Sequence, residues 1–249
     1  MNQLLEISGL TKKYPQFELT DISFSLAEGR IMGLIGKNGA GKTTTLKAML
    51  NLVHPDCGRI QILSRDFPAE EISCKQEIGV VLGEIDFYQH KTLTDITAVT
   101  SRFYKNWDNE AYQHYMNEFE LDPKKRVNQL SQGMRVKYLI ALALSHKARL
   151  LILDEPTSGL DPVSREDLLV LFQALVKNQK RGILFSTHIT SDLDKCADDI
   201  TYIKDGKLLI SAEKERFMKS FEHLKTPNDT GDLSLEEIMI RTDRRNYDV

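Results

Sequence analysis

The sequence predicts an α/β fold in which helices cover a largely parallel β-sheet. From residue 131 onward, short apolar runs alternate with stretches of helical periodicity, a pattern typical of parallel sheets. A glycine-rich segment at residues 36–41 also stands between a strand-like run and a helix-like run. The chain has 249 residues, 41% hydrophobic and 28% charged, so it has the composition of a globular protein with one elaborated domain.

The first third of the chain, residues 1–83, consists of short apolar or alternating runs divided by Gly, Pro and Asp turns. One helix interrupts these strands, because it follows the glycine-rich loop and ends before Pro55 and Gly58, which cannot continue it. The predicted strands are 4–7, 19–26, 31–35, 59–63 and 78–82, and the predicted helix is 42–52.

Residues 84–149 are predicted to form a small helical lobe inserted into the α/β body. Aromatic residues are dense between 84 and 130, at spacings that suit helices. They supply either the core that a small lobe needs or a docking surface on it. The α/β core then comprises 1–83 and 150–225, and residues 226–249 form a tail.

The second half of the chain returns to alternating helices and strands. The tail has a polar loop, 226–231, before a short amphipathic helix. The predicted helices are 133–146, 162–179, 190–197 and 233–240, and the predicted strands are 150–153, 183–186, 200–203 and 208–210.

Charge and cysteine content exclude several classes of function. Lys and Arg total 33 against 36 Asp and Glu, so no overall positive field collects nucleic acid, and no nucleic-acid partner is expected. Cys57, Cys74 and Cys196 lie far apart, which argues against a disulfide framework or a zinc site and favours a reducing cytosol. No secretory signal and no apolar run of about 18 residues is visible, so a membrane role must run through a partner.

The strongest motif is a phosphate-binding loop (P-loop), G-x-x-x-x-G-K-[ST], in the strand–loop–helix context that it requires. Its glycines let backbone N–H groups surround phosphate oxygens, Lys42 reaches the outer phosphates, and the Thr43 hydroxyl can bind Mg²⁺. An ordinary glycine turn before a helix is the alternative. The predicted nucleotide-binding residues here are Gly36, Asn38, Gly39, Ala40, Gly41, Lys42, Thr43 and Thr44.

A second motif is an apolar strand, 150–153, that ends in the carboxylates Asp154 and Glu155. Strand ends of this kind face the ligand crevice in parallel sheets. Asp154 can hold Mg²⁺ through water, while Glu155 can polarise a water molecule for in-line attack on a γ-phosphate. Without the P-loop upstream, an exposed turn would be the preferred explanation of the pair.

Residues 130–134, Leu-Ser-Gln-Gly-Met, precede the helix at 133–146, and Ser131 can cap it. With this segment the chain resembles the ATP-binding cassette (ABC) ATPases, whose signature Leu-Ser-Gly-Gly-Gln lies between the P-loop and the acidic strand. The resemblance covers about residues 4–210 and implies the ABC nucleotide-binding fold: a P-loop core sheet with an N-terminal antiparallel β-subdomain and an inserted helical lobe.

The resemblance assigns further roles. Tyr14 matches the aromatic residue that stacks on adenine, Asp161 the loop through which two cassettes touch, and His188 the histidine that contacts the γ-phosphate. Taken alone, Tyr14 would be read as a packing residue and His188 as a structural histidine. Ser131 and Gly133 match the groups that meet the nucleotide of a second cassette.

Two segments of the chain depart from the family pattern. Gln132 and Met134 replace the first Gly and the Gln of the signature, while Ser131 and Gly133 are kept. The family's Gln at the end of the strand before the lobe, a ligand near Mg²⁺, is Gly83 here, and Glu84 follows it. The site either relies on water and Asp154 alone or recruits the Glu84 carboxylate, and of the two we expect Glu84 to take the place of that ligand.

The resemblance implies a soluble ATPase subunit that dimerises around two MgATP and drives transport through separate transmembrane permease subunits, at the inner face of the cell membrane. The permeases would dock on the lobe near residues 84–105, and the second ATPase is the same chain or a different one. The chain looks most like bacterial ABC-2-type exporters, including those for antimicrobial or amphipathic peptides. The alternatives are a cassette without a membrane partner, such as one for iron–sulfur assembly, and a nucleotide-gated module with little turnover.

Overall fold

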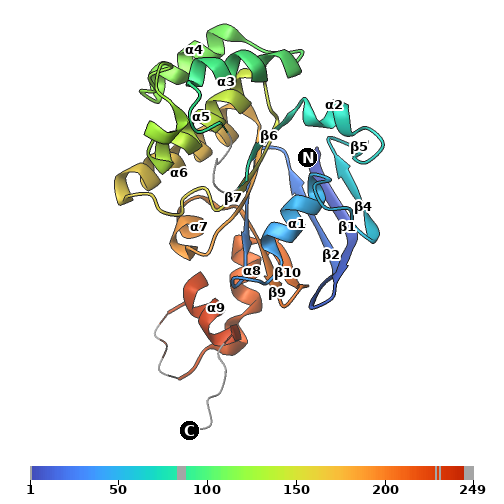
Figure 1. Cartoon of the computed structure of the whole chain (residues 1–249). Helices are drawn as coiled ribbons and strands as arrows, with labels where there is room; N and C mark the ends of the chain where they lie inside the picture. Colours follow the sequence, from blue (N-terminus) through green and yellow to red (C-terminus); the bar gives the residue numbers. More distant parts are fainter. Residues whose placement is uncertain (1, 83–87, 228, 230, 244–249) are drawn as a thin grey trace.

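The computed structural model describes residues 2–82, 88–227, 229 and 231–243, and within these residues ten strands form one curved sheet (Figure 1). The strand order is β5-β4-β1-β2-β10-β9-β3-β8-β7-β6. The strands are β1 (Gln3–Tyr14), β2 (Phe17–Ala27), β3 (Ile31–Ile35), β4 (Cys57–Ile62), β5 (Arg65–Asp66), β6 (Ile78–Val81), β7 (Leu150–Asp154), β8 (Gly182–Ser186), β9 (Asp199–Lys204) and β10 (Lys207–Glu213).

The centre of the sheet is parallel, as predicted: β6, β7, β8, β3 and β9 all run in the same direction. Both faces of these strands are covered, because alternate side chains point to opposite faces of a strand. Leu150 and Ile152 of β7 pack in the same core as Leu46 of helix α1 (Lys42–Met49), and Leu151 and Leu153 pack in a second core with helices from the other face.

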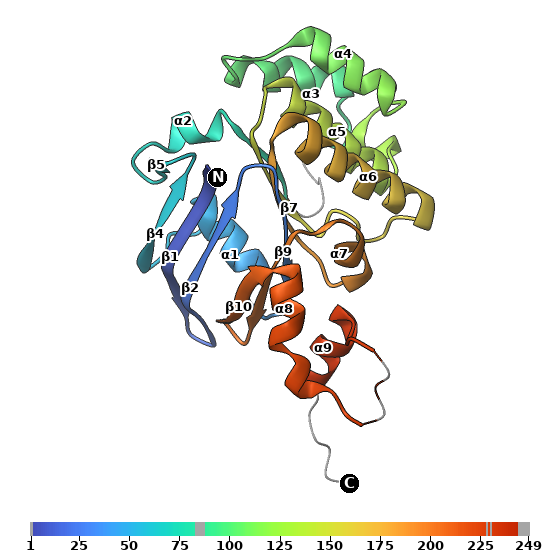
Figure 2. The ribbon, with the colours of Figure 1, turned by 180° about the vertical axis from the view of Figure 1, so that it is seen from behind.

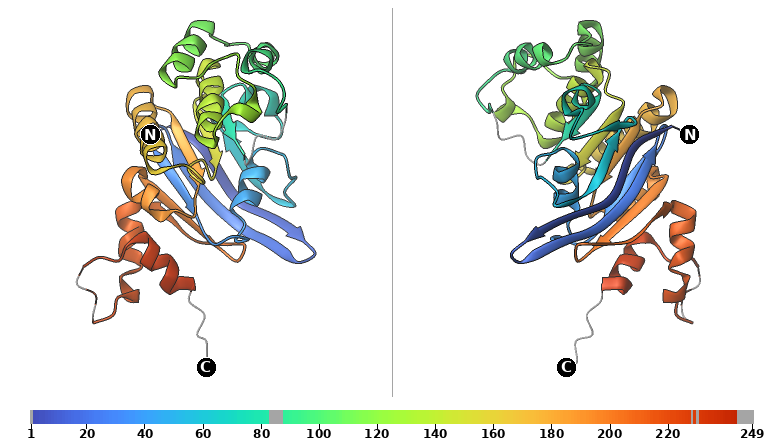
Figure 3. Two further views of the ribbon diagram at one scale, coloured as in Figure 1. Left: turned by 60° about the vertical axis from the view of Figure 1, so that its left-hand side comes forward. Right: turned by 90° about the vertical axis from the view of Figure 1, so that its right-hand side faces the viewer.

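An antiparallel region flanks the parallel strands, formed by β1, β2, β4 and β5, while β10 returns antiparallel beside β9. Figure 3 shows the β1–β2 hairpin reaching far from the centre. β1 is longer than the predicted strand 4–7. The second half of β1 was not predicted, because it carries polar residues and because register shifts against both neighbouring strands interrupt the alternation of buried and exposed side chains. The hairpin closes where Tyr14 pairs with Phe17.

Most helices match the predicted positions, but two were missed: α2, which has five residues, and α8, which follows β10 without a turn signal. Figure 2 shows α8 and α9 together at the end of the molecule opposite α4. The helices beyond α1 are α2 (Glu71–Lys75), α3 (Leu93–Thr100), α4 (Asn109–Glu118), α5 (Gln132–Ser145), α6 (Pro162–Gln179), α7 (Thr190–Cys196), α8 (Lys214–Ser220) and α9 (Leu235–Asp243), with short 3-10 turns at Ser101–Phe103, Val127–Gln129 and Glu222–Leu224.

Helices α3, α4 and α5 lie at one end of the molecule (Figure 1), where α5 packs on β6. Some of the aromatic residues between 84 and 130 pack in the core, and others are exposed to solvent. Phe119 is buried, and Trp107 packs against the core with Tyr112 and Tyr115, whereas Phe103 is 71% exposed. In the described part of the chain, no helix is long and apolar enough to cross a membrane.

Candidate functional site

The P-loop lies between β3 and α1 in a shape that its glycines make possible. Gly36 has a φ of 151°, and a Cβ atom there would lie 2.2 Å from the carbonyl oxygen of Ile203. Gly41 has a φ of 114°, and a Cβ atom there would lie 2.9 Å from Leu19. Gly41 is the N-cap of α1, and no side chain caps this helix. The first N–H groups of α1 are therefore available to an anion.

Lys42 holds the centre of this loop. Its side chain is almost fully buried, and its Nζ donates hydrogen bonds to the carbonyl oxygens of Gly36 at 2.8 Å and Lys37 at 3.4 Å. Burial lowers the pKa of Lys42, and the nearby carboxylates of Glu155 and Asp154 act in the opposite direction. A bound phosphate would add further negative charge, which favours the ammonium form.

A cluster of hydroxyl and carboxylate side chains joins the P-loop to the ends of β7 and β8. The Thr43 hydroxyl donates to Asp154 Oδ2 at 2.9 Å, and the Ser186 hydroxyl donates to Asp154 Oδ1 at 2.5 Å. Two of the three predicted Mg²⁺ ligands, Thr43 and Asp154, are therefore in direct contact. A hydroxyl beside a carboxylate suits the preference of Mg²⁺ for hard oxygen ligands, so these residues fit the ion.

Glu155 and His188 form a pair beside this cluster. Glu155 Oε2 is 2.7 Å from His188 Nδ1 and accepts from the His188 N–H at 3.3 Å, while Glu155 Oε1 lies 3.8 Å from Lys42 Nζ. The Glu155 backbone has a φ of 51°, an unfavourable value for a residue with a side chain, and its N–H donates to Ser186 Oγ at 3.0 Å. The carboxylate is thus held in one place from several directions.

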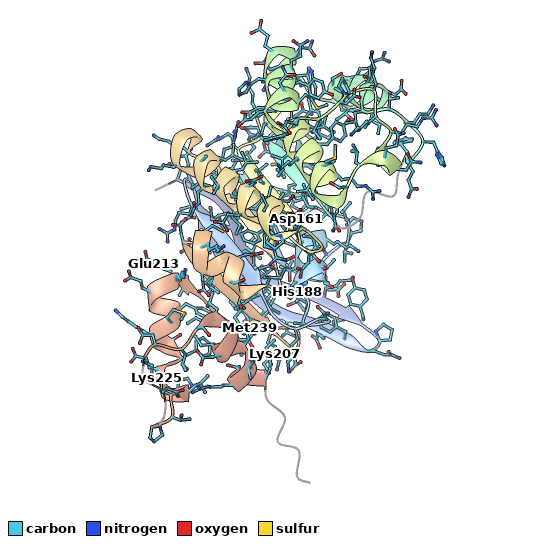
Figure 4. The ribbon with its side chains drawn as sticks, turned by 90° about the vertical axis from the view of Figure 1, so that its left-hand side faces the viewer. Asp161, His188, Lys207, Glu213, Lys225 and Met239 are labelled. Atoms are coloured by element: carbon cyan, nitrogen blue, oxygen red, sulfur yellow. The ribbon has the colours of Figure 1, made fainter. Side chains whose placement is uncertain are left out.

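Ser131, Gly133 and Asp161 lie in the segments at the starts of α5 and α6. Ser131 caps α5 by accepting from the Met134 N–H at 3.3 Å, and Asp161 caps α6 by accepting from the first-turn N–H groups at 3.0 Å. Gly133 is buried, and a Cβ atom there would lie 3.3 Å from Leu160. Among the described residues, no hydrogen bond or ion pair links these three to the P-loop. Figure 4 places Asp161 and His188 in the middle of the molecule.

Tyr14 is 41% exposed at the tip of the β1–β2 hairpin, with its ring centre 6.4 Å from that of Phe17. The Phe17 ring lies against Gly41 of the P-loop, so that a Cβ atom added to Gly41 would be only 3.0 Å from the ring. Sequence reasoning singled out Tyr14 and missed Phe17. The sequence signal that could have identified Phe17 was the tight turn between Tyr14 and Phe17, because such a turn places the two aromatic side chains next to each other.

Comparison with known proteins identifies the chain. The model of the ABC transporter family matches residues 19–158. The chain belongs to the ABC transporter family. It is 34% identical over 236 residues to the uncharacterized ABC transporter ATP-binding protein YcbN of Bacillus subtilis (strain 168), covering 92% of this chain and 77% of the relative.

Two further relatives have more specific names. The bacitracin transport ATP-binding protein BcrA of Bacillus licheniformis is 32% identical over 231 residues, covering 92% of this chain and 73% of the relative. The lantibiotic transport ATP-binding protein SrtF of Streptococcus pyogenes is 30% identical over 213 residues, covering 84% and 91%. The solved structure of an ATP binding subunit of an ABC transporter is 26% identical with a TM-score of 0.84, covering 97% of this chain and 100% of that one.

This ABC protein is therefore the ATP-binding and ATP-hydrolysing component of a transporter, as the sequence predicts. The predicted fold class is confirmed. The relatives are named for transport and give no support to an iron–sulfur assembly cassette. Gly83 and Glu84 lie outside the described residues, so the replacement of the family's glutamine by Glu84 stays a prediction.

Proposed function

We propose that this ABC protein drives the export of antimicrobial peptides through separate transmembrane permease subunits, at the inner face of the cell membrane. The observation that carries the substrate class is its similarity to proteins named for bacitracin transport and lantibiotic transport, at 32% and 30% identity. Both names denote antimicrobial peptides, so the shared chemistry is an amphipathic peptide.

The P-loop is the proposed site of ATP. Its glycines and the free start of α1 offer N–H groups to the phosphates, and Lys42 donates to the outer phosphate oxygens in place of the carbonyls that it contacts here. Asn38, Gly39, Ala40 and Thr44 complete the loop. Tyr14 is the proposed adenine contact, because its partly exposed ring lies beside Phe17, whose own ring lies against Gly41 of the loop.

Thr43 and Asp154 are the residues that would hold Mg²⁺, since their oxygens are 2.9 Å apart at the mouth of the P-loop. When bound, Mg²⁺ neutralises charge on the phosphate oxygens. Glu84 is the proposed source of a further carboxylate at this site.

Glu155 is the proposed base, because its carboxylate lies between Lys42 and His188. It would accept a proton from the water that attacks the γ-phosphorus in line. His188 holds the Glu155 carboxylate through Nδ1 and leaves its other ring nitrogen to contact the γ-phosphate.

Ser131, Gly133 and Asp161 are proposed to act on the nucleotide of a second cassette, because in their own chain they serve helix starts rather than the P-loop. In a head-to-tail dimer, the start of α5 would present the Ser131 hydroxyl and the Gly133 N–H to the partner's γ-phosphate. Two MgATP would then lie between two cassettes, and the energy of closing around ATP would be the driving force.

The lobe formed by α3, α4 and α5, within residues 84–149, is the proposed docking region for the permeases. Apolar side chains that are unusually exposed support this placement: Phe103 is 71% exposed and Val99 is 53% exposed. Ile72 on α2, 81% exposed, belongs to the neighbouring surface of the core.

The test is resistance to peptides. The chain and its permease subunits are expressed together in a bacterium sensitive to bacitracin and to a lantibiotic such as nisin. We expect a higher inhibitory concentration for at least one peptide, and no increase with the Glu155→Gln variant or with the chain alone. Unchanged resistance to both, together with intact ATPase activity of the purified complex, would exclude peptide export.

A further inference from the structure

The end of the tail helix contacts the P-loop directly. Asp243, in the last turn of α9, lies 206 residues from Lys37 in the sequence, yet Lys37 Nζ donates to the Asp243 carbonyl oxygen at 2.8 Å. The same ammonium lies 3.5 Å from Asp243 Oδ1. Lys37 is the second residue of the P-loop motif, so the tail reaches the nucleotide-binding loop itself.

Asp243 is held as a buried acid and not as a surface charge. Its side chain is only 5% exposed. Lys204 Nζ lies 3.4 Å from its Oδ1, and the Tyr202 hydroxyl donates to its Oδ2 at 3.1 Å. Burial of a carboxylate is unfavourable unless charges and donors surround it, and here the two ammonium groups and the Tyr202 hydroxyl offset that cost. Burial, together with the charge of Asp243, raises the pKa of Tyr202, which therefore stays a hydrogen-bond donor.

Lys37, which contacts Asp243 through its side chain, also forms hydrogen bonds within the P-loop through its backbone. The Lys37 carbonyl oxygen accepts from the Ala40 N–H at 3.0 Å and from Lys42 Nζ at 3.4 Å. The Ala40 carbonyl oxygen in turn accepts from the Gly206 N–H at 3.0 Å. Asn38 and Gly39, between them, are exposed and line a cavity of about 390 Å³ that separates the loop from the tail. The ion pair between Lys37 and Asp243 therefore lies beside this cavity, where Asn38 and Gly39 have few packing contacts.

We infer that Asp243 is a positioning residue for the nucleotide site: by holding Lys37, it keeps the P-loop in the conformation that binds the phosphates of ATP. The inference rests on the nucleotide site proposed above. Because coupling between two sites is reciprocal, a tail that supports nucleotide binding must itself become more stable when the nucleotide binds.

The sign of the effect separates positioning from simple electrostatics. Asp243→Asn removes a negative charge near the phosphate site, so a purely electrostatic role would tighten nucleotide binding. A positioning role weakens it, because Lys37 loses its ion pair with the Asp243 carboxylate and keeps only the hydrogen bond to the backbone carbonyl. Lys37→Met breaks the same contact from the other side and leaves the backbone in place.

The first experiment measures the Kd of a non-hydrolysable ATP analogue with Mg²⁺, and the kcat at saturating ATP, for the full chain. We expect Asp243→Asn and Lys37→Met each to raise the Kd about fivefold with kcat unchanged, and the double variant to show the same rise as either single one. Tyr202→Phe is the matched control, because it removes a hydrogen bond from the same carboxylate without touching the loop, and its Kd should stay within about twofold.

Three results would overturn the inference: an unchanged or lower Kd in Asp243→Asn, effects of the two single variants that multiply in the double one, or a rise in Tyr202→Phe equal to that in Asp243→Asn. Failure of the wild-type chain to bind the analogue would instead count against the nucleotide site.

The second experiment reads the reverse direction of the coupling. Amide hydrogen exchange of residues 235–243 should slow when the wild-type chain binds the analogue, and should not change in Lys37→Met at a saturating concentration. Equal exchange rates with and without the analogue in the wild-type chain would contradict a positioning role. That result is the one expected if the tail has a purely structural role.

Discussion

The two halves of the candidate site differ in how their polar groups are used. Around the P-loop, Lys42, Thr43, Asp154, Glu155 and His188 contact one another across three segments of the chain. At the starts of α5 and α6, the polar groups cap their own helices and do not reach the P-loop in the described part of the chain. We therefore propose that one copy holds the groups for phosphate binding and water activation, and that the signature residues Ser131 and Gly133 act on the nucleotide of a second copy.

The largest expected effect falls on the first half. Glu155→Gln keeps the size of the side chain but removes its basicity, so ATP turnover should fall by a factor of between about 10² and 10⁴ while ATP binding is kept. The matched control is Glu166→Gln, an exposed glutamate on α6 that pairs with Lys195, and it should leave turnover unchanged. A Glu155→Gln variant with more than half of the wild-type rate would remove the proposed base.

The second effect concerns His188, which positions the Glu155 carboxylate. His188→Ala should lower kcat by a factor of about 10² to 10³, as for the loss of one stabilising donor, and change ATP affinity little. His114→Ala, on the exposed surface of α4, is the control. If ATP affinity collapses and the variant also unfolds at a lower temperature, then His188 is structural.

A third prediction tests the proposed Mg²⁺ site. Thr43→Val keeps the shape of the side chain and removes the hydroxyl that contacts Asp154. The Mg²⁺ concentration for half-maximal ATPase activity should rise about tenfold or more. Thr44→Val, at the next position of the same helix, should shift it less, and equal shifts would argue that helix stability and not ligation is affected.

The smallest effect is expected at the hairpin. Phe17→Leu removes an aromatic ring beside both Tyr14 and the P-loop, so ATP affinity should weaken by a few-fold, the usual scale of an aromatic pair. Titration with ATP and with inorganic triphosphate separates the causes. Weakening for ATP alone supports an adenine contact, and equal weakening for both ligands places the effect on the loop.

The sequence predicted the half of the site that consists of short motifs, because a P-loop and an acidic strand end depend on local residue types. It also predicted α6 at its full length, 162–179, since Asp161 and Pro162 mark its start. It did not predict β1 beyond residue 7, where polar residues and register shifts hide the strand, or the contact of Asp243 with Lys37, which joins residues 206 positions apart and follows no motif.

The central claim, that the complete site needs two copies, can be tested by mixing two inactive variants. Ser131→Asp keeps a good helix cap but places a carboxylate where the partner's γ-phosphate would lie, so it should be inactive alone, like Glu155→Gln. In a mixed dimer, one of the two sites combines the intact Glu155 of one chain with the intact Ser131 of the other. We predict that the mixture hydrolyses ATP well above the sum of the two separate variants. A rate equal to that sum, with both variants folded and binding nucleotide, would show that Ser131 does not act across a dimer.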